Sequence, residues 1–320
     1  MRIIEQLNKL PINKGEYLVL PNIDTPFFII PMTSKRDFQK AINFIKPKNK
    51  YGWLKKLVLG YLPFVLIRSF FPTIKIATKI TNATTRLILP WNQDFNNKFV
   101  IFNLGEPPSL IKIGFDYASR LIQNEHKVIT KYYNEIFPNI LKYKENEDFC
   151  ILETSFYKGE HPTSLPDSIF DFFKEHYKDC KNVSVENHPY INNMVALINE
   201  KLDKSTYANT LKWISAFILE FKDRQIRISL MHGDCTVTNI ISDDENAKLI
   251  DWEECIEDGI PIDITYFKFR QQIDNNKKWE VKDEIDFLVV LHYIYFQCRY
   301  DNMKRIDAIV LKHNFVCIER

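Results

Sequence analysis

The chain has 320 residues, of which 45% are hydrophobic and 26% charged, a composition typical of a folded globular protein and not of a disordered one. Its 43 basic and 41 acidic residues give a formal net charge of +2, so the chain as a whole lacks the strong positive field that attracts nucleic acid. We therefore expect no nucleic-acid partner, and any anionic ligand has to be bound locally.

The cysteines and the N-terminal residues bear on the compartment. The six cysteines lack the close pairs that a zinc site or a redox motif requires, so we expect reduced thiols. The first residues lack the basic region, apolar stretch and small-residue cleavage site of a secretory signal. These features together predict a cytoplasmic protein.

The longest apolar run, residues 57–67, is too short to cross a bilayer, which takes about 20 residues. It also contains Gly60 and Pro63. Because lysines precede it, peripheral membrane contact through residues 46–72 is one interpretation, with the segment lying on an anionic surface. The other interpretation is burial of the run within the domain, and this is the one we favour.

The first half of the chain predicts an antiparallel sheet. Residues 1–75 hold short apolar runs and a helix pattern that begins near Ser34, and we interpret them as an N-terminal extension. Residues 76–154 are predicted to form a nucleotide-binding N-lobe of a sheet and a helix. Turn-rich sequences separate its first three strand-like runs, which predicts a meander of 86–89, 99–104 and 109–114.

A helix is predicted from about Tyr117 to Phe137, followed by a further strand that reaches Thr154. Gly159 permits a turn, so we place a hinge between two lobes just before it. Residues 155–320 are predicted to form a mainly helical C-lobe that carries the catalytic and metal loops. An almost wholly apolar stretch, 284–300, is expected to be its buried core helix.

The motif with the clearest chemistry runs from Met231 to Asn239, with the sequence Met-His-Gly-Asp-Cys-Thr-Val-Thr-Asn. A tight loop of this spacing can aim the Asp234 carboxylate at a substrate hydroxyl and the Asn239 amide oxygen at Mg²⁺. Twelve residues later Asp251 follows an apolar strand, where its carboxylate would complete the metal site. For each of the three residues the alternative is a cap or turn role. His232 is expected to be a buried residue that fixes the loop.

Lys112 interrupts the apolar strand 109–114, and a lysine in such a position requires an anion. Glu125 lies thirteen residues further on, in the predicted helix. An ion pair between strand and helix is the arrangement that holds a lysine against nucleotide phosphates. The alternatives are a solvent-facing strand lysine and a polar helix position.

These residues resemble the aminoglycoside phosphotransferase and choline kinase-like superfamily, relatives of the protein kinases with a two-lobed fold. The family signature is His-Gly-Asp, four residues, Asn, and then an apolar strand that ends in Ile-Asp-Trp-Glu. Here the corresponding segments are 232–234, Asn239 and 250–253. The resemblance covers roughly residues 80–300 and is strongest over 227–265. It implies an α+β fold, with a small antiparallel-sheet N-lobe and a mainly helical C-lobe.

The resemblance also implies the roles of the site residues. Asp234 would be the catalytic base, and Asn239 and Asp251 the ligands of Mg²⁺. Lys112 and Glu125 would position the phosphates of ATP.

Two further roles are implied. A hinge that includes Thr154 and Phe156 would meet the adenine, and Asp263 would brace the catalytic loop. The chain departs from the family pattern in two places. Residues 235–238 replace the usual apolar residue and Pro or Gly, and the nucleotide loop 92–98 contains no glycine.

The leading hypothesis is an ATP-dependent kinase that transfers the γ-phosphate to a hydroxyl of a small molecule. The acceptor would be a sugar or glycan precursor, an aminoglycoside-like compound or an amino alcohol. Acidic residues within 253–258 are candidates to line its pocket, with a solvated charge run as the alternative. After Asp251 there is no Ala-Pro-Glu segment, which argues against a protein acceptor. The alternative function is a catalytically silent kinase-fold module that binds a nucleotide or a partner.

Overall fold

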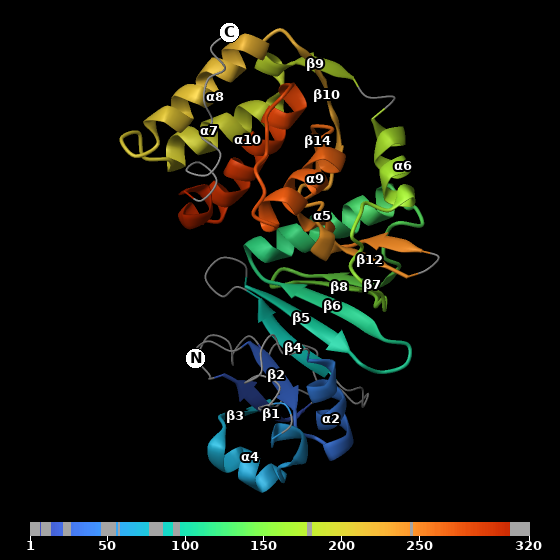
Figure 1. The fold of residues 1–320 in the computed structure, drawn as a ribbon. Helices are drawn as coiled ribbons and strands as arrows, with labels where there is room; N and C mark the ends of the chain where they lie inside the picture. The colour runs from blue at the N-terminus through green and yellow to red at the C-terminus, as the bar shows by residue number, and fades with distance from the viewer. Residues whose placement is uncertain are drawn as a thin grey trace. The chain divides into compact units, whose positions relative to one another are not determined.

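The computed structural model describes residues 7, 14–21, 27–45, 56, 58–76, 86–91, 97–177, 181–243 and 246–307. The chain divides into two compact units, which we describe separately (Figure 1). Unit 1 comprises Met1–Lys127 and Pro138–Phe156, and unit 2 comprises Val128–Phe137 and Tyr157–Arg320. Unit 1 is built on an antiparallel sheet and unit 2 is mainly helical. The predicted α+β fold class is confirmed.

Unit 1 is centred on one eight-stranded sheet with the order β3-β1-β2-β4-β5-β6-β8-β7, in which every pairing is antiparallel. The strands are β1 (Gly15–Leu20), β2 (Phe28–Pro31), β3 (Thr73–Ile76), β4 (Arg86–Trp91), β5 (Lys98–Asn103), β6 (Ser109–Gly114), β7 (Ile140–Glu145) and β8 (Cys150–Ser155). The predicted meander corresponds to β4, β5 and β6, which pair in sequence order.

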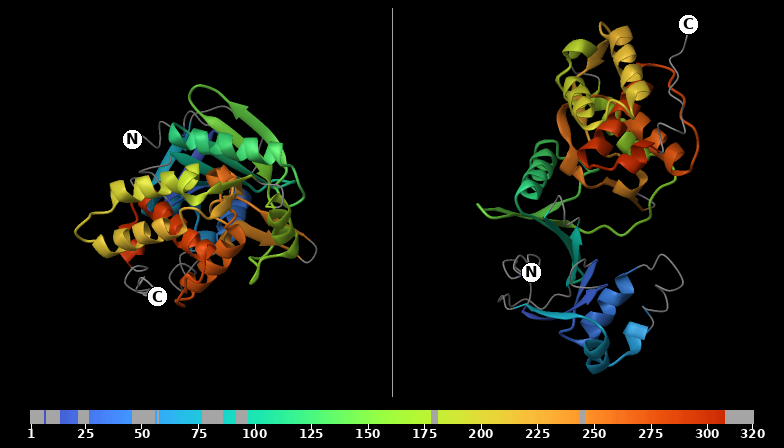
Figure 2. Two further views of the ribbon diagram at one scale, coloured as in Figure 1. Left: turned by 90° about the horizontal axis from the view of Figure 1, so that it is seen from above. Right: turned by 90° about the vertical axis from the view of Figure 1, so that its left-hand side faces the viewer.

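The strands of residues 1–75 belong to the same sheet as the meander. Strand β2 pairs with β4 through Ile29 and Ile88, so the N-terminal segment lengthens the sheet by three strands. Helix α2 (Lys35–Phe44) begins where the Ser34 hydroxyl accepts a hydrogen bond from the Asp37 amide, at 3.1 Å. In Figure 2 this helix and α4 (Phe64–Phe70) lie beside strands β1 to β3. Their inward apolar side chains share one cluster with the sheet.

Two elements of the first half of the chain differ from the prediction. Helix α5 (Tyr117–Lys131) ends before Phe137. Beyond its end the Asn134 side chain accepts a hydrogen bond from the Ile136 amide in a turn. Strand β7 was not predicted. It lies at the sheet edge and is mostly exposed, so its sequence needs no apolar alternation.

Unit 2 is a helical bundle with short two-stranded sheets. Its helices are α6 (Asp167–His176), α7 (Pro189–Lys201), α8 (Ala208–Phe221), α9 (Asp263–Asp274) and α10 (Glu284–Arg299). Its strand pairs are β9 (Asn182–Ser184) with β10 (Gln225–Arg227), β11 (Ser229–Met231) with β14 (Ile256–Gly259), and β12 (Ile240–Ser242) with β13 (Ala247–Leu249). Three short 3₁₀ helices are η1 (Val185–Asn187), η2 (Val237–Asn239) and η3 (Trp252–Glu254).

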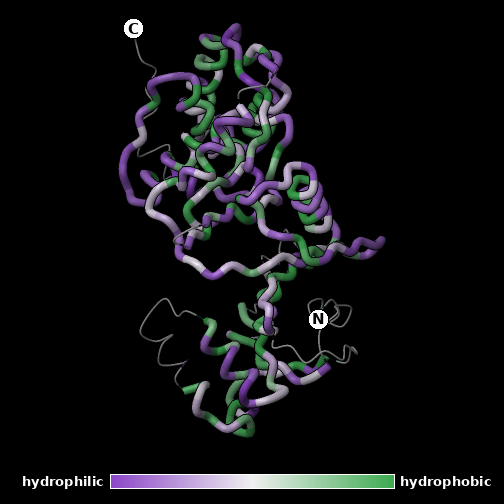
Figure 3. Tube along the Cα trace, turned by 90° about the vertical axis from the view of Figure 1, so that its right-hand side faces the viewer, coloured by the Kyte–Doolittle hydropathy of each residue, from purple (hydrophilic) through white to green (hydrophobic). Residues whose placement is uncertain are grey.

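Helix α10 is the core of unit 2. Its residues from Phe287 to Ile294 are buried on every side, which confirms the predicted core helix. Apolar stretches, drawn in green in Figure 3, run through both units. Over the described part of the chain, no helix combines the length and the apolar character needed to cross a membrane. The four cysteines at described positions, Cys150, Cys235, Cys255 and Cys298, are buried and are not joined in disulfides; Cys180 and Cys317 lie outside the described residues.

We expect Phe287→Ala to lower the free energy of unfolding by about 3–5 kcal/mol. Its ring is 1% exposed and stacks on Phe217 with the ring centroids 3.7 Å apart, so truncation leaves a cavity in the core. The matched control is Leu219→Ala on α8, a side chain that is 68% exposed, which should change stability by about 0.5 kcal/mol or less. Urea denaturation followed by circular dichroism measures both. Equal effects of the two substitutions would contradict this description of the core.

Candidate active site

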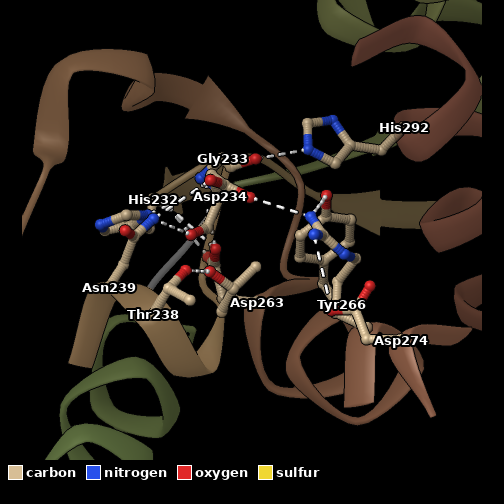
Figure 4. Close-up of polar contacts among 11 residues, drawn as sticks. His232, Gly233, Asp234, Thr238, Asn239, Asp263, Tyr266, Asp274 and His292 are labelled. Atoms are coloured by element: carbon tan, nitrogen blue, oxygen red, sulfur yellow. Dashed lines mark hydrogen bonds and ion pairs between the residues drawn. The ribbon is translucent and has the colours of Figure 1, made fainter. Parts of the chain in front are cut away.

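The loop after β11 turns sharply at Gly233, whose φ is +86° (Figure 4). Glycine is required there, because a Cβ at this position would lie 2.5 Å from the Glu254 carbonyl oxygen. The His232 and Gly233 amides point to the Asp263 carboxylate at the start of α9. The three hydrogen bonds measure 3.1, 3.2 and 3.4 Å.

Asp263 is 1% exposed, and burial raises the pKa of its carboxyl group to about 7. The Tyr177 hydroxyl donates a further hydrogen bond to it at 3.4 Å. The carboxylate therefore binds the backbone of the loop, and it does not face a substrate. This geometry agrees with the bracing role that the sequence predicted for Asp263.

His232 connects the two loops that carry the predicted chemistry. Its Nδ1 accepts a hydrogen bond from the Asp234 amide at 3.2 Å, and its Nε2 lies 3.0 Å from the Ile250 carbonyl oxygen. A carbonyl oxygen can only accept, so Nε2 carries the proton and the ring is neutral. The ring is fully buried and packs edge-on against Trp252. His232 thus fixes the loops and is not placed to shuttle protons.

The side chains of Asp234 and Asn239 meet in the same loop. The Asn239 amide nitrogen donates to the Asp234 backbone oxygen at 2.8 Å and to a carboxylate oxygen of Asp234 at 3.1 Å. The backbone just before Asp251 is bonded to this loop, because the Ile250 amide donates to the Asn239 carbonyl oxygen at 2.8 Å. The backbone of Asp251 is left-handed, with a φ of +67°, which ends strand β13 in a turn.

The pKa of Asp234 is raised to about 6, chiefly because burial penalises its charged form. The Arg270 guanidinium opposes this shift, and the negative charge of Asp251 adds to it. Asn239 and Asp251 supply an amide oxygen and a carboxylate, which are hard oxygen ligands of the kind that suits Mg²⁺.

Two residues of this site were missed from the sequence. Arg270 on α9 donates to the Asp234 carboxylate and to the Tyr266 hydroxyl, both at 3.2 Å. It follows Asp263 by seven residues, which places both on one face of a helix; this spacing is the signal that was available.

The other missed residue is His292 in the core helix α10. Its Nε2 lies 2.7 Å from the Gly233 carbonyl oxygen (Figure 4). Its Nδ1 is 2.8 Å from the Tyr190 hydroxyl. Burial lowers the pKa of His292 to about 4, so the ring is neutral and donates from Nε2 to the loop. No sequence signal separates this histidine from an ordinary core residue.

In unit 1 the predicted pair forms. The Lys112 ammonium group lies 2.8 and 3.0 Å from the two Glu125 carboxylate oxygens, linking β6 to α5. The Lys112 side chain is 9% exposed and that of Glu125 is 2% exposed. A buried lysine held by both oxygens of a carboxylate has a fixed position, which a phosphate-binding lysine requires.

Thr154 and Phe156 lie at the end of β8. Thr154 is buried and pairs with Leu110 in the sheet. The Phe156 amide donates to the Pro108 carbonyl oxygen at 3.2 Å, and its ring packs against Phe44 and Phe102. An adenine contact with the Phe156 amide would have to replace that hydrogen bond, so the predicted hinge role stays a prediction. Residues 92–96 of the predicted nucleotide loop lie outside the described residues.

The acidic run after Asp251 mostly serves the protein's own structure. Glu254 binds Arg299 and Tyr300, and Glu257 binds Lys131 and Tyr132. These contacts favour the structural interpretation of the run over a pocket lining.

No protein-family model matches the sequence, and no curated protein matches it. Solved structures that are similar in fold are small-molecule phosphotransferases. A thermostable mutant of aminoglycoside phosphotransferase APH(4)-Ia in complex with ADP and hygromycin B is 12% identical, with a TM-score of 0.47 and coverage of 71% of this chain and 93% of that chain.

A macrolide 2'-phosphotransferase type I is 10% identical, with a TM-score of 0.43 and coverage of 76% of this chain and 93% of that chain. Aminoglycoside phosphotransferase APH(3'')-Id from Streptomyces rimosus ATCC10970 is 12% identical, with a TM-score of 0.40 and coverage of 62% and 89%. Because these likenesses are distant, we base the functional proposal on contacts within the chain itself.

The raised pKa of Asp263 predicts a pH-dependent stability. A carboxyl group with a pKa of about 7 in the folded state, against an ordinary value of 3.8, favours folding below pH 4 and loses that contribution as the pH rises through 7. In Asp263→Asn this dependence should disappear, so the free energy of unfolding of the wild type falls relative to the variant between about pH 4 and 7. Urea denaturation across this range measures it. Asp171→Asn, at an exposed position of α6, is the control. Parallel curves for the wild type and Asp263→Asn would contradict the prediction.

The buried pair in unit 1 predicts strong coupling. Glu125→Leu alone should lower the free energy of unfolding by about 3–5 kcal/mol, because it leaves the Lys112 ammonium group buried without its carboxylate. The double variant Lys112→Met/Glu125→Leu should recover most of that loss, since no charge remains buried. A double-mutant cycle by urea denaturation measures the coupling. Additive effects of the two substitutions would show that the pair does not form in solution.

Proposed function

We propose that this chain is an ATP-dependent phosphotransferase that moves the γ-phosphate onto a hydroxyl group of a small molecule. The observation that carries the proposal is the cluster in unit 2. One loop joins the Asp234 carboxylate to the Asn239 amide, and a second loop, which carries Asp251, is hydrogen-bonded to the first through Ile250. Phosphoryl transfer needs little covalent chemistry from the protein and depends on this kind of positioning.

In the proposed reaction Asp234 accepts the proton of the acceptor hydroxyl while the hydroxyl oxygen attacks the γ-phosphorus of ATP. The bond between the γ-phosphorus and the β–γ bridging oxygen breaks, and ADP leaves with that oxygen. Its raised pKa is suited to this role, because a carboxylate of higher pKa is a stronger base. Asn239 holds the carboxylate in place through its amide nitrogen. Arg270 steadies the other carboxylate oxygen.

Asn239 and Asp251 are the residues proposed to hold Mg²⁺, through the amide oxygen and the carboxylate. When bound, the ion would offset negative charge on the phosphates of ATP. Lys112, fixed by Glu125, is proposed to contact those phosphates. Thr154 and Phe156 are proposed to lie near the adenine of ATP. Residues 76–154 remain our proposed nucleotide-binding lobe, and residues 155–320 the proposed catalytic lobe.

Arg270 adds a feature that the sequence did not predict. Its Nε is buried, and among the described residues it has no hydrogen-bond partner. The guanidinium group binds Asp234, the proposed catalytic base, and its Nε–H is a further hydrogen-bond donor. Such a group is suited to stabilise negative charge on the acceptor or on the transferred phosphoryl group. As acceptor we propose a polyhydroxyl compound, a sugar or glycan precursor first, and then an aminoglycoside-like compound or an amino alcohol.

Asp234→Asn should reduce phosphate transfer by about 10²- to 10⁴-fold, because the amide cannot accept the hydroxyl proton. Nucleotide binding should be retained, since Asp234 is proposed to contact the acceptor and not the nucleotide. The matched control is Asp223→Asn, an exposed aspartate of the same unit, which should keep full activity. Mass spectrometry of sugars, aminoglycosides and amino alcohols incubated with ATP and Mg²⁺ detects the product by a gain of about 80 Da, one phosphoryl group in place of a hydrogen.

If the wild type phosphorylates none of these acceptors and still binds ATP in a thermal-shift assay, the chain is a nucleotide-binding module. If Asp234→Asn transfers phosphate as fast as the wild type, Asp234 is not the base.

A further inference from the structure

Large apolar side chains gather on the surface of unit 1 at helix α4 and the helical residues just before it. Five side chains between positions 58 and 70 are exposed: Val58 (43%), Tyr61 (82%), Val65 (67%), Leu66 (42%) and Phe70 (73%). We call these five the apolar patch. The described residues contain eleven exposed large hydrophobic side chains, so nearly half of them fall within thirteen positions. Single exposed apolar residues are ordinary, but a contiguous group indicates a binding surface.

The apolar patch is held by a well-packed inner face. On the other side of the same segment Leu59 and Ile67 are buried in the cluster that joins α2, α4 and the sheet. The Phe64 ring packs edge-on against Phe38 with the ring centroids 5.3 Å apart. The segment is therefore apolar both inside and outside. The buried side chains of the inner face are enough to pack the segment against the sheet. The exposed apolar side chains of the outer face therefore require another explanation.

The predicted burial of the apolar run 57–67 thus holds for only part of it. Leu59 and Ile67 are buried, whereas Tyr61 and Val65 are exposed. Of the range 46–72, for which membrane contact was the alternative, residues 46–55 and 57 lie outside the described residues.

The charges of this part of the chain are strongly one-sided. Residues 38–93 contain ten lysines and arginines and no aspartate or glutamate. The whole chain has 43 basic and 41 acidic residues, so the remainder carries 33 basic and 41 acidic residues. The near-neutral total conceals a segment with a net charge of +10 beside a remainder with a net charge of −8.

The described basic residues show how this charge is presented. Lys40 on α2 and Lys75 on β3 are exposed, and Lys75 lies opposite Glu16 in the pairing of β3 with β1. Arg68 is also exposed, and it is paired with Glu16, an acidic residue from outside the segment, at 2.6 Å. The acidic residues of the neighbouring elements are Asp37 at the start of α2 and Glu16 on β1, and both lie outside residues 38–93.

We propose that the apolar patch docks on an anionic lipid membrane. Exposed Tyr, Phe, Val and Leu side chains can enter the boundary between head groups and acyl chains, while nearby lysines attract anionic head groups. Apolar insertion and basic charge are the two signals that together give a stable peripheral attachment. The absence of carboxylates from the segment removes the groups that an anionic surface would repel. Nucleic acid would account for the charge but not for the exposed apolar side chains.

This inference does not depend on the proposed phosphotransferase activity, because none of its residues belongs to the candidate active site. It adds a location to that activity: a kinase attached at this surface would act on acceptors at or near a membrane.

Vesicle binding of the full chain tests the proposal. We expect it to sediment with vesicles that contain phosphatidylglycerol, with an affinity at least about tenfold higher than for vesicles of phosphatidylcholine alone. Raising the salt concentration to about 0.5 M should weaken the binding, because it screens the charge attraction. Binding to neither kind of vesicle, or equal binding to both, would overturn the proposal. These measurements use the wild type, so they stand whatever happens to a variant.

The triple variant Tyr61→Ser/Val65→Ser/Phe70→Ser removes the most exposed apolar side chains. It should lose at least about tenfold in affinity for the anionic vesicles, with an unchanged thermal midpoint, since all three side chains point to solvent. Leu219→Ser on α8 is the matched control, an exposed apolar side chain outside the apolar patch, and it should bind as the wild type does.

Wild-type affinity of the triple variant would overturn the role of the apolar patch. So would a wild type that forms dimers or binds nucleic acid through these side chains but does not bind anionic vesicles. In that case a second copy or a nucleic acid is the occupant.

Discussion

The candidate active site depends on the buried carboxylate of Asp263. It accepts hydrogen bonds from the His232 and Gly233 amides and so holds the backbone of the loop directly before Asp234. Such amides would otherwise be buried donors without acceptors, each costing about 1–3 kcal/mol. Helix α9 thereby fixes the loop from one side, and the same helix supplies Arg270 to the Asp234 carboxylate. One helix therefore positions both the backbone and the side chain of the proposed base.

Two neutral histidines complete this arrangement. His232 accepts a hydrogen bond from the Asp234 amide and donates one to the Ile250 carbonyl oxygen. These two bonds couple the first loop to the loop that carries Asp251. His292 donates to the Gly233 carbonyl oxygen from the core helix α10. Both rings are buried, and in each the direction of the hydrogen bonds defines which nitrogen carries the proton. The loop is therefore anchored to the packed core of unit 2, and Asp234 is kept in a partly desolvated position that raises its pKa.

The sequence predicted what short-range patterns can encode. The order of the His-Gly-Asp, Asn and Ile-Asp-Trp-Glu segments pointed to two loops that hydrogen bonds bring together. An isolated lysine in an apolar strand led to the pair with Glu125. The alternating strands of the meander and the apolar helix α10 were predicted because burial imposes a period on the sequence. The boundaries of the elements were predicted less well: α5 ends at Lys131, before the predicted Phe137, and a turn at Asn134 follows it.

What the sequence did not predict depends on contacts between distant segments. Arg270 and His292 reach the loop from helices whose packing no local pattern specifies, so they resembled ordinary helix residues. Edge strand β7 lacks apolar alternation because only one neighbour pairs with it. The apolar run near α4 was only partly buried, and a hydropathy pattern alone cannot distinguish side chains that face a core from side chains that face a partner.

The central claim is that Asn239 and Asp251, held beside Asp234, bind a divalent ion together with the nucleotide. Electron paramagnetic resonance with Mn²⁺, a spectroscopic substitute for Mg²⁺, measures this directly in the presence of a non-hydrolysable ATP analogue. We expect the wild type to bind the Mn²⁺–nucleotide complex, and Asn239→Ala and Asp251→Ala each to weaken the binding of the ion by at least about tenfold. Undiminished Mn²⁺ binding in both variants would contradict the account.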